Sequence, residues 1–333
     1  MTDKIALEEH FITETLAPYA AGNQPTQDAA AFAMLRRRLA DFGEGRLAAM
    51  DAAGIGYAVL SATVPGVQAE PDAAKAVALA RRANDELAEE VRKQPARYGG
   101  FAALPLQDPA AASAELERAM RELGFHGAMI NGHTHGHYLD EERFRPFWER
   151  ADALAAPIYL HPCDPVGTLA MFAGRPELNG SVWAWTVEAA THALRLVLGG
   201  TLTRHRRVKI ILGHMGETLP YVMARLDSRT RHSGREFAPE ELPSAILRRQ
   251  FWITTTGVCD PASLATAIAN LGEDRVMFSV DYPYENGAEA AAFLASAPIL
   301  EAVRAKIGRG NAAGVLGLSY WRETGFTKKR STK

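Results

Sequence analysis

Acidic and imidazole side chains end four apolar runs that lie far apart in this sequence of 333 residues. The first run, "KIALEEHF", ends on two glutamates and a histidine, and three later runs end on His161, His214 and Asp281. Carboxylates and imidazoles are ligands that Zn²⁺ and Mn²⁺ take in proteins. If these runs are strands whose ends meet, the sequence predicts a site for one divalent cation.

Glu8 and Glu9 cannot both face that site, because successive side chains on a strand point to opposite faces. Glu8 and His10 share one face. If His10 faces the cation, Glu8 is the ligand, and Glu9 faces the helical layer or a neighbouring loop. The predicted ligands are therefore Glu8, His10, His161 and Asp281. Two of the four ligands are carboxylates, and this proportion of oxygen ligands favours Mn²⁺, with Zn²⁺ as the alternative. The lack of a thiolate argues against a closed structural zinc site.

The segment "GHMGETLPYVMARLD" places His214 just after an apolar run and Glu217 three residues later. His214 could be a fifth ligand, or a base and acid that a carboxylate partner holds in place. Because four other ligands are present, we favour the proton-handling role, with Glu217 as the partner. Arg225 lies two helical turns beyond Glu217, and it either meets an anionic group of the substrate or is a solvated helix charge.

The segment "NGHTHGHY" begins on Asn131, which ends another apolar run and is therefore a candidate for contact with a substrate. His133, His135 and His137 follow at alternate positions, as metal ligands can. They lie in a glycine-rich segment, however, and we interpret them as part of a loop that helps to line the pocket.

The apolar runs predict strands that helices separate. Eight runs are continuous rather than alternating in polarity, which is typical of parallel strands buried on both faces; they cover residues 4–10, 56–62, 98–105, 126–131, 157–162, 208–214, 251–256 and 275–281. Amphipathic helices fit residues 71–91, 108–123, 142–155, 187–204, 217–229, 261–271 and 297–307. Strands that alternate with helices predict an α/β fold, and eight such units predict a (β/α)₈ TIM barrel. A doubly wound open sheet is the rival, but no GxGxxG follows the first strand.

One barrel domain is expected over residues 1–320, with its active site at the carboxyl ends of the strands, where the predicted ligands lie. Two connections at that end are long, residues 11–45 after the first strand and 163–186 after the fifth. Such loops usually cover or shape an active site. Residues 321–333 form a basic tail that we expect to be disordered, because it has almost nothing to bury.

Composition excludes several classes of partner. With 37 basic and 39 acidic residues, the formal net charge of −2 favours neither nucleic acid nor an anionic membrane. Cys163 and Cys259 form no CxxC motif and cannot be a disulfide framework, so we expect a reducing, cytoplasmic compartment. The N-terminus lacks the features of a signal peptide, and no apolar run approaches the length of a membrane span.

The sequence resembles a known family. Its segments "ALEEHF", "FAALPLQDP", "YLHP", "IILGHMGETLPY" and "FSVDYPYEN" are similar to those of the amidohydrolase-related decarboxylases. The resemblance covers residues 4–318, and within the family it is closest to the γ-resorcylate (2,6-dihydroxybenzoate) decarboxylases. The aminocarboxymuconate-semialdehyde decarboxylases are more distantly similar.

This resemblance implies a metal-dependent decarboxylase that needs no organic cofactor and assembles as a homodimer or homotetramer. It places the metal ligands on the four residues that strand parity predicts, and the catalytic histidine and glutamate on His214 and Glu217. Hydrolase relatives begin with a His-x-His pair, and Glu8 replaces its first histidine, as in the decarboxylase branch. The chain departs from the resorcylate enzymes at Cys163-Asp164, at Val280 and in a shorter loop at 132–139, so the exact substrate stays open.

The mechanism that we expect acts on a small aromatic acid with a hydroxyl group ortho to its carboxylate. The phenolate and one carboxylate oxygen would chelate the metal. Direct loss of CO₂ would leave an aryl carbanion, so the ring carbon must first be protonated. Asp281 is the expected proton donor, in contact with His214 and Glu217. The remaining predicted contacts are Arg225 or Asn131 to orient the substrate, Tyr284 to pack against its ring, and Arg46 to reach a pocket across a subunit interface.

Two other functions compete with this hypothesis. A metal-dependent hydrolase or hydratase on the same barrel would use a metal-bound water against a lactone, an amide or an alkene, with Asp281 or His214 as the base. A non-catalytic barrel that serves as a scaffold would have apolar residues at the ligand positions, which this sequence does not have.

Overall fold

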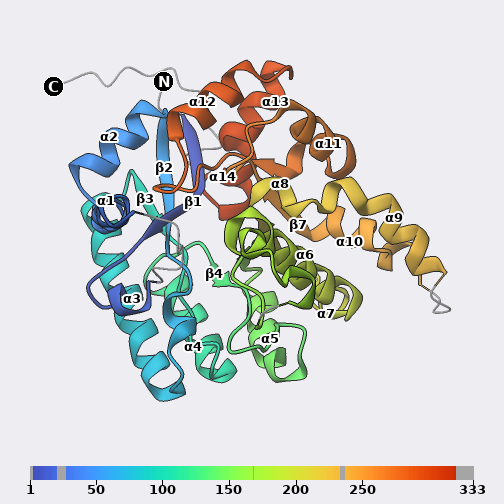
Figure 1. The fold of residues 1–333 in the computed structure, drawn as a ribbon, viewed down its shortest axis with the longest axis horizontal. Coiled ribbons are helices and arrows are strands. Elements are labelled where there is room, and N and C mark those ends of the chain that lie inside the picture. Colours follow the sequence, from blue (N-terminus) through green and yellow to red (C-terminus); the bar gives the residue numbers. More distant parts are fainter. Residues whose placement is uncertain (1–2, 21–27, 168, 233–236, 320–333) are drawn as a thin grey trace.

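The computed structural model describes residues 3–20, 28–167, 169–232 and 237–319, and the predicted tail at 321–333 lies outside them. Figure 1 shows a central set of strands with helices packed around it. The strands are β1 Lys4–Phe11, β2 Ile55–Ala62, β3 Tyr98–Gly100, β4 Ala128–Asn131, β5 Pro157–His161, β6 Lys209–Leu212, β7 Phe251–Thr254 and β8 Val276–Met277. All adjacent pairs within the two sheets are parallel.

The strands close into a barrel. They form one sheet in the order β1-β2-β3 and a second in the order β4-β5-β6-β7-β8. Single parallel bridges join the two sheets at both seams, between Ala102 and Ala128 and between Glu9 and Tyr282. The predicted (β/α)₈ barrel is confirmed.

The longer helices follow the strands and cover the outside of the barrel (Figure 1). They are α1 Ala29–Ala40, α2 Glu44–Ala52, α3 Ala73–Lys93, α4 Pro109–Arg121, α5 Arg145–Ala153, α6 Ala184–Leu198, α9 Leu219–Arg231, α10 Pro243–Gln250, α11 Pro261–Leu271 and α12 Gly287–Ser296. Shorter α-helical segments are α7 Thr201–Arg204, α13 Glu301–Ala305 and α14 Asn311–Leu316. The short segment α8 His214–Glu217 has non-helical backbone angles, and a π-helical turn spans Lys306–Gly310. Short 3₁₀ turns lie at Ala17–Tyr19, Gly66–Ala69, Glu142–Phe144, Ala170–Phe172, Pro176–Leu178, Gly180–Val182, Pro239–Glu241 and Glu273–Arg275.

Local sequence signals account for the best-predicted helices. The Asp72 carboxylate accepts a hydrogen bond from the Lys75 amide and caps α3, and Asp108 caps α4 with Pro109 in the first turn. Helix α1 lies inside the connection that was predicted to be a long loop, and α2, α10 and α12 were not predicted. In α1, little hydrophobic patterning marks the helix, and Leu39 is its one fully buried residue among those described.

Two apolar clusters fill the fold. Side chains that point inward from the strands, among them Leu7, Val59 and Tyr159, pack inside the barrel, and α14 closes one end. A larger cluster lies between the strands and the helices. The strands are thus buried on both faces, as their continuous apolar runs predict. No helix in the described ranges has the length and apolar character needed to cross a bilayer.

Candidate metal and catalytic site

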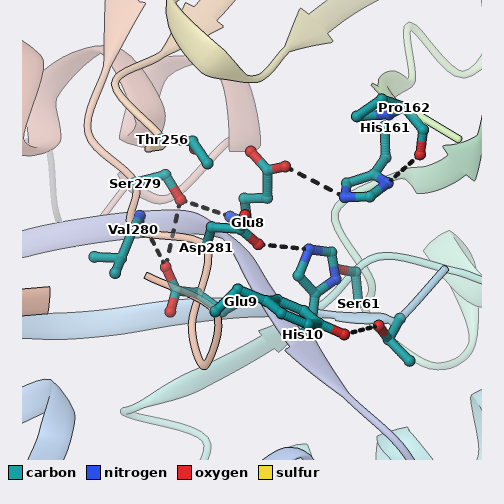
Figure 2. A network of polar contacts seen from close by, with 12 residues as sticks. Glu8, Glu9, His10, Ser61, His161, Pro162, Thr256, Ser279, Val280 and Asp281 are labelled. Atoms are coloured by element: carbon teal, nitrogen blue, oxygen red, sulfur yellow. Dashed lines mark hydrogen bonds and ion pairs between the residues drawn. The ribbon is translucent and has the colours of Figure 1, made fainter. Parts of the chain in front are cut away.

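Strand β1 presents Glu8 at the mouth of the barrel because it contains a bulge. Two of its residues, Leu7 and Glu8, lie opposite the single residue Val59 of β2. A bulge shifts the alternation of side chains by one position. Leu7 therefore packs inside the barrel, and after the bulge Glu8 and His10, rather than Glu9, face the site (Figure 2).

The four predicted ligands converge from β1, β5 and the segment after β8. The imidazole Nε2 of His10 lies 3.1 Å from Asp281 Oδ1, and that of His161 lies 3.5 Å from Glu8 Oε1 (Figure 2). Candidate ligand atoms of Glu8, His10 and His161 lie within 4.8 Å of one another, and so do those of Glu8, His214 and Asp281. The predicted convergence is therefore what the fold produces.

The donor atoms fit a divalent cation. Glu8 Oε1, His10 Nε2 and Asp281 Oδ1 are buried and make no hydrogen bond within the described ranges, although buried polar atoms nearly always have a partner. The Nδ1 of His161 lies 2.8 Å from the carbonyl oxygen of Pro162. Because a carbonyl only accepts, Nδ1 carries the hydrogen and the Nε2 lone pair faces the site.

Burial sets the protonation of two of these groups. It raises the pKa of the Glu8 carboxyl and lowers the pKa of the His161 imidazole well below its ordinary value. The neutral imidazole is the form that binds a metal, and a cation beside Glu8 would restore its negative charge. The Tyr159 hydroxyl donates to Glu8 Oε2 and lies 3.0 Å from Thr254 Oγ1. These contacts fix the second carboxylate oxygen of Glu8.

His214 and Glu217 lie on a left-handed turn. The φ angles of the segment are 47° at His214, 55° at Met215, 80° at Gly216, 51° at Glu217 and 65° at Thr218. Non-glycine residues rarely adopt such angles, and they concentrate at functional sites. The regular helix that was predicted from residue 217 begins only at Leu219.

The turn brings the two side chains together as a dyad. His214 Nδ1 lies 2.6 Å from Glu217 Oε1, while Nε2 faces Glu8 Oε1 at 4.0 Å and Asp281 Oδ2 at 3.9 Å. Burial alone would lower the pKa of His214, but the carboxylates of Glu217 and Glu8 raise it well above its ordinary value. Burial likewise opposes ionisation of Asp281, yet the neighbouring imidazoles of His10 and His214 lower its pKa. These opposite shifts favour a proton on His214 over one on Asp281.

A cavity of about 1210 Å³ opens over this cluster. The site residues His161, His214, Glu217 and Asp281 form part of its lining. Trp183 and Trp185 contribute apolar surface from the segment after β5. A polar floor beside aromatic walls suits a small aromatic molecule that carries an anionic group.

Asn131 and Tyr284, two of the predicted substrate contacts, line the cavity. The Oδ1 atom of Asn131 is buried and has no hydrogen-bond partner in the described part of the chain. The Tyr284 hydroxyl lies 2.6 Å from Thr63 Oγ1, and its ring stands edge-on to the His10 ring at 5.7 Å. Both side chains are placed to touch a bound ligand.

Arg46 and Arg225 do not line the cavity in the described ranges. Arg46 is 1% exposed, and its guanidinium donates to the carbonyls of His10 at 2.6 Å and Asp41 at 2.7 Å. These contacts lie within one chain, and the contact of Arg46 with a pocket across a subunit interface stays a prediction. Arg225 is exposed on α9, in agreement with the alternative of a solvated helix charge.

The histidines after β4 each bind a different partner. His133 Nε2 lies 3.1 Å from the Asp164 carbonyl, His135 Nε2 lies 3.1 Å from the Glu70 carbonyl, and His137 pairs with a glutamate at the surface. His133 and His135 line the cavity. The prediction of a pocket-lining loop is confirmed.

Sequence reasoning missed Arg36, which lines the cavity from α1. No signal marked it, because the surrounding segment was predicted to be a loop. It also left Asp164 without a role. The Asp164 carboxylate accepts a hydrogen bond of 2.8 Å from Trp185 Nε1 and thereby holds the aromatic wall beside His161.

Comparisons with known proteins give the same picture. The sequence model of the amidohydrolase family matches residues 10–318. The γ-resorcylate decarboxylase of Polaromonas sp. (strain JS666) is 43% identical over 328 residues, which cover 96% of this chain and 100% of that protein. The crystal structure of a 2,6-dihydroxybenzoate decarboxylase complexed with 2,6-dihydroxybenzoate has 43% identity and a TM-score of 0.89, and covers 95% of this chain and 100% of its own.

A second crystal structure contains a metal. The dihydroxybenzoic acid decarboxylase from Polaromonas sp. JS666, with bound manganese and the inhibitor 2-nitroresorcinol, has 43% identity and a TM-score of 0.88 over 96% of this chain and 98% of its own. A more distant relative is the 2-amino-3-carboxymuconate-6-semialdehyde decarboxylase of Dictyostelium discoideum, 28% identical over 68% of this chain and 62% of that protein. Both resemblances inferred from the sequence segments are confirmed.

Proposed function

Because this chain belongs to the amidohydrolase family, we propose that it is a metal-dependent decarboxylase of an aromatic acid with a hydroxyl group ortho to its carboxylate. The observation that carries this proposal is the convergence of a carboxylate-rich ligand set with the His214–Glu217 dyad under one cavity. The similarity to decarboxylases over the whole barrel supports the same reaction.

Glu8, His10, His161 and Asp281 are the residues that would hold the metal. When bound, a divalent cation, Mn²⁺ in our proposal and Zn²⁺ as the alternative, would supply positive charge that anchors the substrate carboxylate and favours the phenolate. The polar atoms that lack partners at this place support this assignment. No organic cofactor is needed, because the phenolate itself can donate electrons into the ring.

Asp281 delivers the proton in this proposal, and His214 supplies it. The protonated imidazole of His214, held by Glu217, faces Asp281 Oδ2 at 3.9 Å. Substrate brings negative charge beside Asp281, which raises its proton affinity so that it accepts the proton and passes it to the ring carbon bearing the carboxylate. The carbon–carboxylate bond then breaks, its electron pair restores the aromatic ring, and CO₂ leaves.

Two side chains would orient the substrate. Asn131 offers a free Oδ1 acceptor toward the cavity, and Tyr284 offers its ring beside His10. The cavity wall beside Trp185 excludes water from one side of the ring. Exclusion of water strengthens each electrostatic contact with the carboxylate.

The direct test measures CO₂ release from 2,6-dihydroxybenzoate and from other ortho-hydroxybenzoates by Mn²⁺-loaded enzyme. Asp281→Asn should abolish turnover while Tyr284→Phe, which keeps the ring, should retain it. A Mn²⁺-loaded Asp281→Asn enzyme with substantial decarboxylation would remove Asp281 from this role. Hydrolysis of a lactone or amide by the wild-type enzyme, without CO₂ release, would favour the hydrolase instead.

We further infer a single catalytic domain over residues 1–320 that assembles as a homodimer or homotetramer in the cytoplasm. Cys163 and Cys259 are both free, in agreement with a reducing compartment. Sedimentation of the purified protein would establish its subunit number.

A further inference from the structure

The Ser279 hydroxyl accepts hydrogen bonds from two successive backbone amides of β1. The amide of Leu7 donates to Ser279 Oγ at 3.0 Å and the amide of Glu8 donates at 2.7 Å. Leu7 and Glu8 are the two residues that lie opposite Val59 in the bulge. In a regular strand, successive amides point in opposite directions, so one acceptor can serve both only where the strand is bulged.

The same hydroxyl uses its hydrogen as well. Ser279 Oγ donates to Glu9 Oε1 at 3.4 Å, and the amide of Val280 donates to the same oxygen at 3.3 Å (Figure 2). Ser279 is 0% exposed and Glu9 is 2% exposed. One hydroxyl therefore has all its hydrogen-bonding capacity used by the bulge and by the glutamate that faces away from the site.

This contact replaces a regular ladder between β8 and β1. Strand β8 ends at Met277, and beyond it the backbone pairing to β1 consists of bonds from Asp281 N to Glu8 O at 2.9 Å and from His10 N to Tyr282 O at 2.7 Å. Between Met277 and Asp281, the side chains of Ser279 and Glu9 make the contacts that join the segment after β8 to β1.

The bulge decides which glutamate reaches the metal. Ile5 and Leu7 point inside the barrel, so an uninterrupted alternation would place Glu9 on that face and Glu8 outside. We propose that Ser279, oriented by Glu9, is a positioning residue that holds the bulge and thereby selects Glu8 and His10 as metal ligands. This inference rests on the proposed metal site.

Arg46 supports the same arrangement from the outer side. Its guanidinium donates to the His10 carbonyl at 2.6 Å and lies 4.7 Å from the centre of the Tyr282 ring. The segment after the bulge is therefore held in place on both sides of His10.

The first experiment compares Mn²⁺ binding by the wild type, Ser279→Ala and the control Ser113→Ala. Ser113 is a nearly buried serine of α4 whose hydroxyl donates to the Pro109 carbonyl. Loss of a residue that orients a metal ligand typically weakens binding about 10–100-fold. We expect a weakening of that size for Ser279→Ala, by Mn²⁺ titration with electron paramagnetic resonance, and wild-type affinity for Ser113→Ala.

The second experiment tests the role of Glu9. Glu9→Gln keeps an acceptor oxygen for Ser279 and Val280 and should bind Mn²⁺ within about 3-fold of the wild type, whereas Glu9→Ala should lose about 10-fold or more. The comparison of Glu9→Gln with Glu9→Ala also tests the proposed role of Ser279 if Ser279→Ala does not fold. Rescue by Gln but not by Ala shows orientation by a hydrogen-bond acceptor.

Each outcome is informative. Folded Ser279→Ala with wild-type Mn²⁺ affinity would overturn the inference, as would equal affinities for Glu9→Ala and Glu9→Gln. If the wild type and all variants fail to bind Mn²⁺ and Zn²⁺, the proposed metal function is wrong. If the wild type binds Mn²⁺, the variants test the role of Ser279 separately from the metal function.

Discussion

Gly216 at the centre of the left-handed turn gives the sharpest test of how the dyad is built. Its φ is 80°, and a Cβ added there would lie 2.8 Å from Ile253 Cγ2 and 3.1 Å from Pro220 Cδ. Replacing it by Ala therefore imposes two penalties. A left-handed conformation costs a non-glycine residue about 1–2 kcal/mol, and overpacking of a filled site costs about 1–3 kcal/mol more.

Gly216→Ala should then lose about 2–5 kcal/mol of unfolding free energy, the sum of the two penalties. Gly124→Ala is the matched control, because Gly124 has a φ of 73° and no atom within 4 Å of the added Cβ. The control should lose only about 1–2 kcal/mol. Urea denaturation of the two variants isolates the contribution of the contacts.

The same substitution should affect turnover. Relief of the contact with Ile253 would move His214 and Glu217, and a displacement of about 1 Å can reduce a rate about 100-fold. We expect CO₂ release by Gly216→Ala to fall at least about 10-fold, and Gly124→Ala to keep the wild-type rate. Equal stability of the two variants, together with unchanged turnover, would refute the argument that this turn is under steric constraint.

Three other predictions follow from buried polar groups and the metal. Tyr159→Phe removes the hydroxyl that donates to Glu8 and should weaken Mn²⁺ binding about 10-fold or more, measured by titration; unchanged affinity would contradict the role of Tyr159. Burial lowers the pKa of His126, beside the Tyr57 hydroxyl at 2.9 Å, to about 4. In the unfolded chain the imidazole takes up its proton near pH 6.5, so below that pH protonation favours the unfolded state. The free energy of unfolding is therefore unaffected by His126 above pH 6.5 and falls as the pH drops toward 4, by about 2 kcal/mol at pH 5. The free energy of unfolding, measured by urea denaturation, should fall less between pH 7.5 and pH 5 in His126→Gln than in the wild type. Equal falls in the two proteins would argue against a role for His126 in this pH dependence. Removal of metal by a chelator should lower the thermal midpoint, since ligand at 100 times its Kd contributes about 2.7 kcal/mol; an identical midpoint with and without Mn²⁺ would count against the site.

Much of the barrel could be predicted because its signals are local. The strands β1, β2 and β5 were predicted to within one residue at each end, since continuous apolar runs mark buried parallel strands. Strands β3 and β8 are shorter than predicted, with three and two residues. Their apolar runs continue after the backbone has left the ladder, and hydropathy does not distinguish a buried strand from a buried extended segment.

The substrate-facing side chains were the least predictable part. Asn131 was predicted to contact the substrate because it ends a strand, and it lines the cavity because strand ends lie at the mouth in this fold. Arg46 and Arg225 lie on helices, where sequence spacing shows which residues share a face but not what that face contacts. Arg36 reaches the cavity through a helix whose weak patterning concealed it.

The sequence by itself determined which chemical groups reach the mouth of the barrel, because each acid and imidazole directly follows a locally recognisable strand. It also determined that Glu8 and His10 share a face. Only the tertiary structure decided which face that is. The regular alternation of Ile5 and Leu7 would have placed Glu9 at the site, and a bulge held by Ser279, 271 residues away from Glu8 in the sequence, reverses the choice.

The geometry of the His214–Glu217 dyad was likewise decided by the tertiary structure. The spacing of His214 and Glu217 indicated a pair, but a right-handed helix was expected around Glu217. Packing against Ile253 and Pro220 instead accommodates a left-handed turn that joins His214 to Glu217 and aims its Nε2 at Asp281. Such conformations are unfavourable locally, so only the contacts of the surrounding fold can select them.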